Sequence, residues 1–201
     1  MISSYRLGDL LYYMLSESEI NKILEEHPNS VGSKYIIEKR STDNSLSNID
    51  LMTKIILDCC EQNKHLLPNC IENNTVIHLR LGDVVGGTEY HELIKRPLEV
   101  SELREKLDGN NTKKYVIGKC FFAETSSKNV DESTYLSNKY LNDVIKEFDG
   151  IHFDSGNPDI DLCCAVKSKL FIQGRGHFSK LIVDVRKKLN LDCIETEHLT
   201  G

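Results

Sequence analysis

The segment that most constrains the fold is an apolar run that ends in a glycine and an aspartate. β-Branched and aliphatic residues dominate the run from Thr75 to Leu81, and Gly82-Asp83 follow it. This composition is typical of a short strand buried on both faces of a parallel sheet. Ligands of open α/β sheets bind beyond the carboxyl ends of the strands. Any chemistry of this strand is therefore expected at the end that leads into Gly82-Asp83.

His78 and Arg80 are the candidate binding residues of this strand. Alternate residues of a strand share a face, so both side chains are expected to point the same way, and Gly82 would let a ligand approach the backbone. The planar guanidinium of Arg80 suits a phosphate or carboxylate better than a lysine would. Asp83 is expected to hold Arg80 or the loop in place. The alternative is that Arg80 only pairs with an acid and that His78 is a core histidine.

From residue 74 onward, strand-like and helix-like segments alternate. Further strands are expected at 114–122, 151–153 and 170–173, and helices from Pro97, at 136–148, from Pro158 and at 178–189. Such alternation predicts an α/β fold, a Rossmann-like parallel sheet with helices on both faces and right-handed crossovers.

The second site signal is the run Gly174 to Ser179, between the last long strand and the last long helix. Its glycines let the backbone approach a ligand, and the unpaired N–H groups of a helix start attract phosphate. We therefore expect substrate contacts from these residues: Arg175, Gly176, His177, Phe178 and Ser179.

Both runs resemble motifs of the fucosyltransferases. His78-Leu79-Arg80-Leu81-Gly82-Asp83 is similar to the family's H-x-R-x-(G/T)-D motif, and Leu170 to Ser179 is similar to its closing motif of a strand, small residues, Ser/Phe and a helix. The resemblance covers roughly residues 74–190. It departs at Leu81, where the family often has a second arginine, and at Gly176-His177, where the family usually has Ser-Ser/Thr.

Fucosyltransferases of this group have the two-domain GT-B fold and take the sugar from GDP-fucose without a metal. The resemblance implies an inverting glycosyltransferase that moves a 6-deoxyhexose, fucose or rhamnose, from a nucleoside diphosphate sugar to a glycan acceptor. It places Asp161 near the nucleotide. No cofactor or metal is expected, because Arg80 and the helix start would stabilise the leaving pyrophosphate. The two carboxylates of Asp159-Ile160-Asp161 are expected to diverge in a helix start.

At 201 residues the chain is short for two full Rossmann-like domains. Residues 73–201 are expected to form the nucleotide-sugar-binding part, and residues 1–72 a reduced N-terminal helical or edge segment on the acceptor side. The chain could equally be one module of a larger polypeptide. In the N-terminal part, the capping-box pattern Ser16 to Glu19 predicts a helix that ends before Pro28, Tyr35-Ile36-Ile37 predicts a strand, and Ile49 to Cys59 predicts a helix.

The tetrapeptide Arg-Leu-Gly-Asp occurs twice, at residues 6–9 and 80–83. One interpretation is that both copies line a single cleft, with Arg6 and Gly8 at the substrate and Asp9 as the general base that takes the acceptor's proton. Chance is the competing explanation of so short a repeat. Glu124 and Thr125 follow the expected strand 114–122 and are candidates for contact with a ribose or base, although a plain turn explains them equally well.

Composition excludes several classes of function. The net charge of −6 argues against broad nucleic-acid or anionic-membrane binding. The seven cysteines lack C-x-x-C spacing and are expected to be reduced core residues of a cytoplasmic protein. The chain contains no apolar run long enough to span a membrane.

Two other classes of function stay open on the sequence alone. The first is a metal-dependent phosphoesterase or hydrolase, whose candidate residues are His78, Asp83, His91, His152 and Asp154. A divalent metal requirement would identify it. The second is a non-catalytic nucleotide-binding module, which the small size favours.

Overall fold

The computed structural model describes residues 7, 15–40, 47–85, 96–122 and 129–196. Several residues predicted to form the site lie outside this part of the chain: Arg6, Gly8, Asp9, Glu124 and Thr125.

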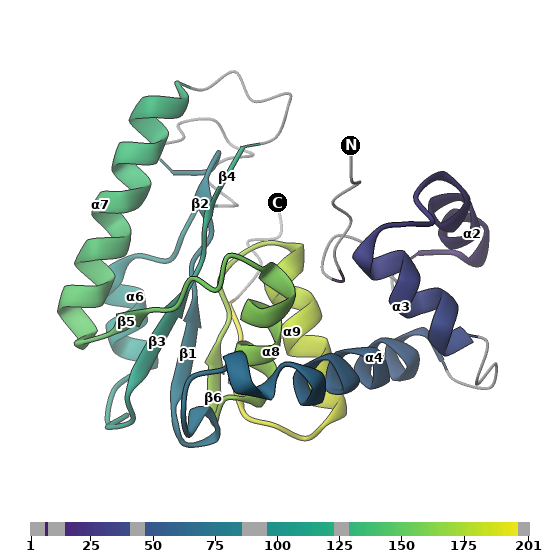
Figure 1. Cartoon of the computed structure of the whole chain (residues 1–201). Helices are drawn as coiled ribbons and strands as arrows, with labels where there is room; N and C mark the ends of the chain where they lie inside the picture. The colour runs from purple at the N-terminus through teal and green to yellow at the C-terminus, as the bar shows by residue number, and fades with distance from the viewer. Residues whose placement is uncertain (1–6, 8–14, 41–46, 86–95, 123–128, 197–201) are drawn as a thin grey trace.

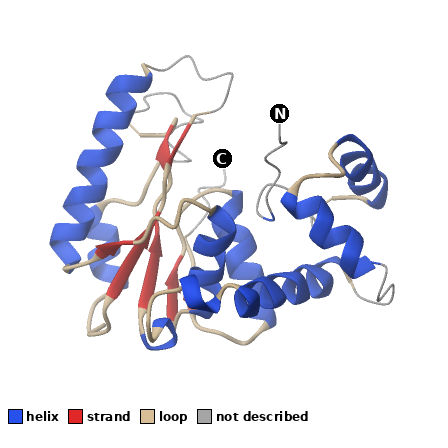
Figure 2. Cartoon of the chain, viewed as in Figure 1, coloured by secondary structure: helices blue, strands red, loops and turns tan. Residues whose placement is uncertain are grey.

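The centre of the fold is a five-stranded sheet in which all neighbouring strands are parallel. In spatial order its strands are β5 (Ile151–His152), β3 (Lys114–Ile117), β1 (Thr75–His78), β6 (Leu170–Ile172) and β7 (Cys193–Ile194). The helices beside it are α6 (Val100–Lys106), α7 (Val130–Phe148), α8 (Pro158–Lys167) and α9 (His177–Lys188). Figure 1 and Figure 2 show the sheet between α6 and α7 on one face and α8 and α9 on the other. The predicted Rossmann-like parallel sheet with helices on both faces is confirmed.

The central strand buries alternate residues in two separate cores. Val76 packs in the core that includes Leu162 of α8 and Leu181 of α9. Ile77 packs in the opposite core, which includes Val144 of α7. All four residues of β1 are buried, as expected for an apolar strand covered on both faces.

The strand order reverses at β1. From β1 the chain adds β3 and β5 on one side of the sheet, then returns to add β6 and β7 on the other. In open α/β sheets ligands bind in the crevice at such a switch point, beyond the carboxyl ends of the strands. In this protein the switch point lies between the ends of β1 and β6.

Two short strands continue beyond β1 and β3. They are β2 (Leu81–Gly82) and β4 (Cys120–Phe121), which pair in parallel as a separate sheet. The single strand predicted over 114–122 is therefore interrupted after Ile117, and Gly118 and Lys119 lie between its two pieces. This break places Lys119 to Phe121 beside the end of β1.

The predicted start is correct for α8 but not for α7, which begins at Val130, six residues before the expected start at 136. Asn157 caps α8 through a hydrogen bond that its side chain accepts from the Asp159 N–H, with Pro158 as the first helical residue. The start expected at Pro97 is wrong by three residues, because Glu99 and Glu102 form a capping box and α6 begins at Val100.

The N-terminal part is helical and consists of α2 (Glu17–Glu26), α3 (Val31–Arg40) and α4 (Asn48–Gln62). The capping box at Ser16 and Glu19 starts α2, as predicted. The strand predicted at Tyr35-Ile36-Ile37 is wrong, because these residues lie in the middle of α3. Only Ile36 is fully buried and Ile37 is exposed, so packing of one helix face overrides the β preference of the tripeptide.

Helix α4 packs against α8 and α9, outside the layer that covers the sheet (Figure 1). Cys59 and Cys60 of α4 and Cys163 and Cys164 of α8 are buried at this contact. All seven cysteines are free, but the prediction that they are core residues holds only for these four, because Cys120 and Cys193 are half-buried and Cys70 is exposed. The predicted boundary between residues 72 and 73 stays a prediction.

Arg186 of α9 is completely buried and binds only uncharged acceptors. Its guanidinium donates to one hydroxyl and to five backbone carbonyls, four of which lie at the C-terminal end of α8 and just beyond it: the Ser168 hydroxyl and the carbonyls of Ala165, Val166, Ser168, Lys169 and Asp192. Burial lowers its pKa to about 10. The carbonyls that a helix end leaves unpaired, together with the negative end of its dipole, compensate the buried charge.

None of the helices in the described ranges is both long and apolar enough to cross a membrane.

Candidate functional site

A pocket of about 550 Å³ opens at the carboxyl ends of the sheet strands. Its lining comes from the segments that follow β1, β3, β5 and β6: residues 78–81 and 117–121, then Asp154, Gly156, Pro158 and Asp161, and finally residues 175–178. The volume is within the range of small-molecule sites. The pocket thus lies where the strand order reverses.

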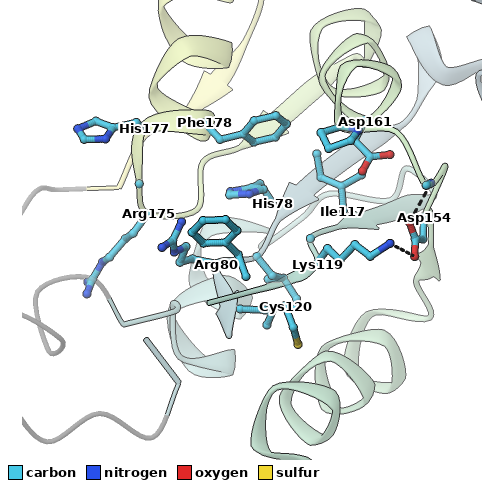
Figure 3. A pocket seen from close by; sticks show the side chains of 17 residues that line it. His78, Arg80, Ile117, Lys119, Cys120, Asp154, Asp161, Arg175, His177 and Phe178 are labelled. Carbon is cyan, nitrogen blue, oxygen red and sulfur yellow. Dashed lines mark hydrogen bonds and ion pairs between the residues drawn. The ribbon is translucent and has the colours of Figure 1, made fainter. Parts of the chain in front are cut away.

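The pocket is electrically divided. Figure 3 shows Arg80 and Arg175 toward one end, Lys119, Asp154 and Asp161 toward the other, and His78 between them. Arg175 is buried and its side chain points away from the other labelled groups, so the cationic end presents the Arg80 guanidinium, and the other end presents two carboxylates with an ammonium.

Asp83 orients Arg80 at the cationic end. Nη2 of Arg80 donates to both carboxylate oxygens of Asp83, at 3.0 and 3.3 Å. The Arg80 side chain remains 28% exposed, so the ion pair does not bury the guanidinium. Arg80 lines the pocket and Asp83 does not, which agrees with the predicted role of Asp83 as the residue that holds Arg80.

The loop after β6 brings the start of α9 next to Arg80. A Cβ at Gly176 would lie 3.8 Å from both Cδ and Nη1 of Arg80. Gly176 has φ +99°, a backbone conformation that favours glycine. The Ser179 hydroxyl donates to the carbonyls of Gly174 and Gly176, 2.6 and 2.9 Å away, and so fixes the loop. Ser179 is buried and does not line the pocket, so it supports the loop and does not contact the substrate as predicted.

Gly174 is packed directly against His78. A Cβ there would lie 2.4 Å from the His78 carbonyl oxygen and 2.5 Å from its Nδ1, closer than atoms can approach. Only a glycine lets the strand ends of β1 and β6 come this close. The two motifs found in the sequence are therefore in direct contact.

His78 is only 7% exposed and lies beside Phe178, with ring centroids 5.3 Å apart. Burial, with a smaller effect of the nearby Arg80 charge, lowers the pKa of His78 to about 3. Its Nδ1 has no hydrogen-bond partner among the described residues. The imidazole is thus neutral at physiological pH and does not add positive charge to the site.

The acidic end is built from the segment before α8. Asp161 accepts hydrogen bonds from the backbone N–H and hydroxyl of Ser155, and burial raises the pKa of its carboxyl. Asp154 is 3.7 Å from the ammonium of Lys119. Both carboxylates are hydrogen-bond acceptors for a ligand that carries hydroxyl or amine groups.

Asp159 does not line the pocket and binds the backbone of Leu7 instead. Its Oδ1 accepts the backbone N–H of Leu7 at 3.1 Å, and Leu7 is completely buried. The expected divergence of the Asp159 and Asp161 carboxylates is confirmed, because they bind Leu7 and Ser155 respectively. Leu7 is the described residue of the first Arg-Leu-Gly-Asp copy, and it lies close to α8, whose Pro158 and Asp161 line the pocket.

The structure brings most of the described site predictions into one pocket: His78, Arg80, Asp161, Arg175, Gly176, His177 and Phe178. Gly82 is not part of the lining. It lies in β2, and its N–H donates to the Ser137 hydroxyl. The sequence reasoning missed Lys119, Cys120 and Phe121 because it placed them inside a continuous strand. The available signal was Gly118, which interrupts that strand.

Across the described ranges, no three His, Cys, Asp or Glu side chains are grouped so that they could hold a metal ion. The residues proposed for a metal-dependent hydrolase do not cluster: His78 and Asp154 line the pocket, Asp83 pairs with Arg80, and His91 lies outside the described residues.

Comparison with known proteins found no matching family model and no matching curated protein.

Proposed function

We propose that this protein is a glycosyltransferase that moves a 6-deoxyhexose, fucose or rhamnose, from a nucleoside diphosphate sugar to a glycan acceptor. The observation that carries the proposal is the contact between the two motifs, which sets the Arg80 guanidinium beside the first residues of α9 at the sheet's switch point. A guanidinium and a helix start are both phosphate-binding elements. Their convergence supports a diphosphate ligand.

In this proposal, Arg80 and the start of α9 stabilise the leaving group. When the bond between the sugar and the diphosphate breaks, negative charge develops on the phosphate oxygen that departs. Arg80, held by Asp83, and the amides at the start of α9 are already in position to stabilise that charge without a metal.

The nucleoside would occupy the acidic end. Asp154 and Asp161 can accept hydrogen bonds from ribose hydroxyls or base N–H groups there. Inverting transfer also needs a general base near the acceptor hydroxyl. Asp9, which lies outside the described residues, remains the predicted base.

Thermal shift measurements with GDP-, UDP- and dTDP-sugars test the proposal directly. A ligand at 100 times its dissociation constant should stabilise the fold by roughly 2.7 kcal/mol. The shift should persist in EDTA and disappear in Arg80→Ala. If no nucleotide sugar shifts the melting temperature, or if EDTA abolishes the shift, the proposal is contradicted.

A non-catalytic nucleotide-binding module is the second candidate. The observation that favours it is the presence of one Rossmann-like sheet in the described part of the chain, where GT-B enzymes have two such domains. Release of nucleotide from a bound nucleotide sugar in the presence of glycan acceptors would exclude this alternative.

A further inference from the structure

Phe121 is a large apolar side chain that remains exposed inside the pocket. It lines the cavity, yet 57% of its surface is accessible. Its backbone is fixed by the pairing of β4 with β2, in which Phe121 lies opposite Gly82 and its carbonyl accepts the Asp83 N–H at 2.9 Å. Ligand pockets are lined mainly by apolar and aromatic side chains, so an accessible phenyl ring in the lining offers a ligand an apolar contact. The ring is therefore a preformed surface available to a ligand.

The position of the ring identifies which part of a ligand it meets. The guanidinium carbon of Arg80 lies 5.7 Å from the centroid of the Phe121 ring, so the ring borders the cationic end of the pocket. The carboxylates that suit a nucleoside lie at the other end (Figure 3). In a nucleoside diphosphate sugar, the group attached to the diphosphate on the side away from the nucleoside is the sugar that is transferred.

We propose that Phe121 is the platform for the transferred sugar and makes the site selective for 6-deoxyhexoses. This inference rests on the proposed glycosyl transfer and extends it to sugar recognition. The methyl group and neighbouring C–H groups of a 6-deoxyhexose form an apolar surface that can pack on a phenyl ring. A hexose with a hydroxyl at C6 would instead lose hydration of that hydroxyl against a ring that offers no hydrogen-bond partner.

The selectivity expected from this contact is moderate. Apolar sites discriminate by about ten- to a hundredfold between ligands that differ by one small group. Phe121→Ala should therefore reduce the preference for the 6-deoxy sugar without abolishing the binding of the nucleotide, which depends on Arg80 and the α9 start.

The test compares two donors that differ only at C6, by titration calorimetry, which needs no acceptor. GDP-L-fucose and GDP-L-galactose are such a pair, and for a rhamnose-binding site the pair is the L-rhamnose and L-mannose nucleotides. The free nucleoside diphosphate reports whether the variant is folded and binds phosphate. Tyr135→Ala is the matched control, because Tyr135 is an aromatic residue of α7 that is 67% exposed and does not line the pocket.

The wild type and Tyr135→Ala should bind the 6-deoxy sugar at least about tenfold more tightly than its C6-hydroxy counterpart, and in Phe121→Ala the ratio should fall to about twofold. Affinity for the free diphosphate should not change. An unchanged ratio in Phe121→Ala overturns the inference and leaves the glycosyltransferase proposal intact. Equal affinity of the wild type for both sugars overturns the inference and also the 6-deoxyhexose preference within the proposed function, but not nucleotide-sugar transfer itself. Failure of the wild type to bind any nucleotide sugar contradicts the proposed function itself, and the inference falls with it.

Discussion

Nη2 of Arg80 lies 3.0 and 3.3 Å from the two carboxylate oxygens of Asp83, three residues later in the chain. The pair is local in sequence, yet it fixes a guanidinium beside a loop that comes more than ninety residues later. Asp83 is thus a positioning residue for Arg80, and the two can be tested separately.

Asp83→Asn should weaken nucleotide binding and leave stability almost unchanged. The amide can accept from Arg80 but removes the charge that orients it, and a hydrogen bond to a charged partner is worth about 1.5–3 kcal/mol. We expect an affinity loss of about tenfold or more by calorimetry. Glu147→Gln, which breaks the exposed pair of Glu147 with Arg104, is the control and should have no effect. Equal affinities of the two variants would rule out a positioning role.

Arg80→Lys should be harmful even though it keeps the charge. A lysine ammonium cannot reproduce the planar fork that contacts Asp83 and phosphate oxygens together. By analogy with removal of an oxyanion-hole donor, the loss in kcat/KM should be about 2–4 kcal/mol. The comparison is made among wild type, Arg80→Lys and Arg80→Ala, each with EDTA and with added manganese. Near-wild-type rates in the lysine variant would show that only the charge matters.

Gly174→Ala should destabilise the protein and disrupt the pocket. The new methyl group would lie 2.4 Å from the His78 carbonyl oxygen, so the ends of β1 and β6 must separate. Overpacking of this kind costs about 1–3 kcal/mol, measured by urea unfolding. Gly109→Ala is the control for binding: nothing lies within 4 Å of its Cβ, so it should cost a comparable ~1–2 kcal/mol through its left-handed backbone but leave nucleotide binding unchanged. A Gly174→Ala variant that binds nucleotide normally would contradict the close contact.

The free energy of unfolding should rise with pH between about 3 and 6.5, the pKa values of His78 in the folded and unfolded states. Burial lowers its folded pKa to about 3, whereas an unfolded histidine titrates near 6.5. Between these values the unfolded state binds more protons, so acid favours unfolding, and this contribution is fully present only above about pH 6.5. The slope attributable to His78 is at most about 1.4 kcal/mol per pH unit. Urea unfolding at about pH 5 and pH 7.5 gives the change in free energy of unfolding between the two pH values. This change should be smaller in His78→Gln than in the control His65→Gln, which alters an exposed histidine. If the two variants show the same change between the two pH values, His78 does not cause the pH dependence.

Arg186→Met should be strongly destabilising. Methionine fills similar space but leaves unpaired the carbonyls that the guanidinium satisfies near the end of α8. Breaking a buried charged network costs about 3–5 kcal/mol. Lys187→Met removes an exposed cation from the same helix and should cost less than about 1 kcal/mol. Similar unfolding midpoints for the two variants would show that the buried charge is not needed.

Much of the fold could be predicted because its determinants are local. The caps at Ser16 and Asn157 act within three residues, and the helices that follow begin where these caps specify. The run from Thr75 is mostly β-branched and aliphatic because β1 is covered on both faces, so its burial is readable without knowledge of its neighbours. The alternation of strands and helices after residue 74 then favours a parallel sheet.

The structure was needed wherever partners are distant in the chain. The tripeptide Tyr35-Ile36-Ile37 has strand composition, but packing against α4 makes it helical. The interruption at Gly118 brings Phe121 into the pocket, although the local sequence predicts one strand.

The sequence by itself determined which residues could bind a phosphate, because a guanidinium and a glycine-rich helix start have that capacity wherever they occur. That Arg80 and the loop around Gly176 share one cleft is an expectation from the glycosyltransferase hypothesis, which the sequence by itself could not establish. That proximity depends on the pairing of β1 with β6 and on the absence of a side chain at Gly174. Both are consequences of long-range packing, which only the tertiary structure decides.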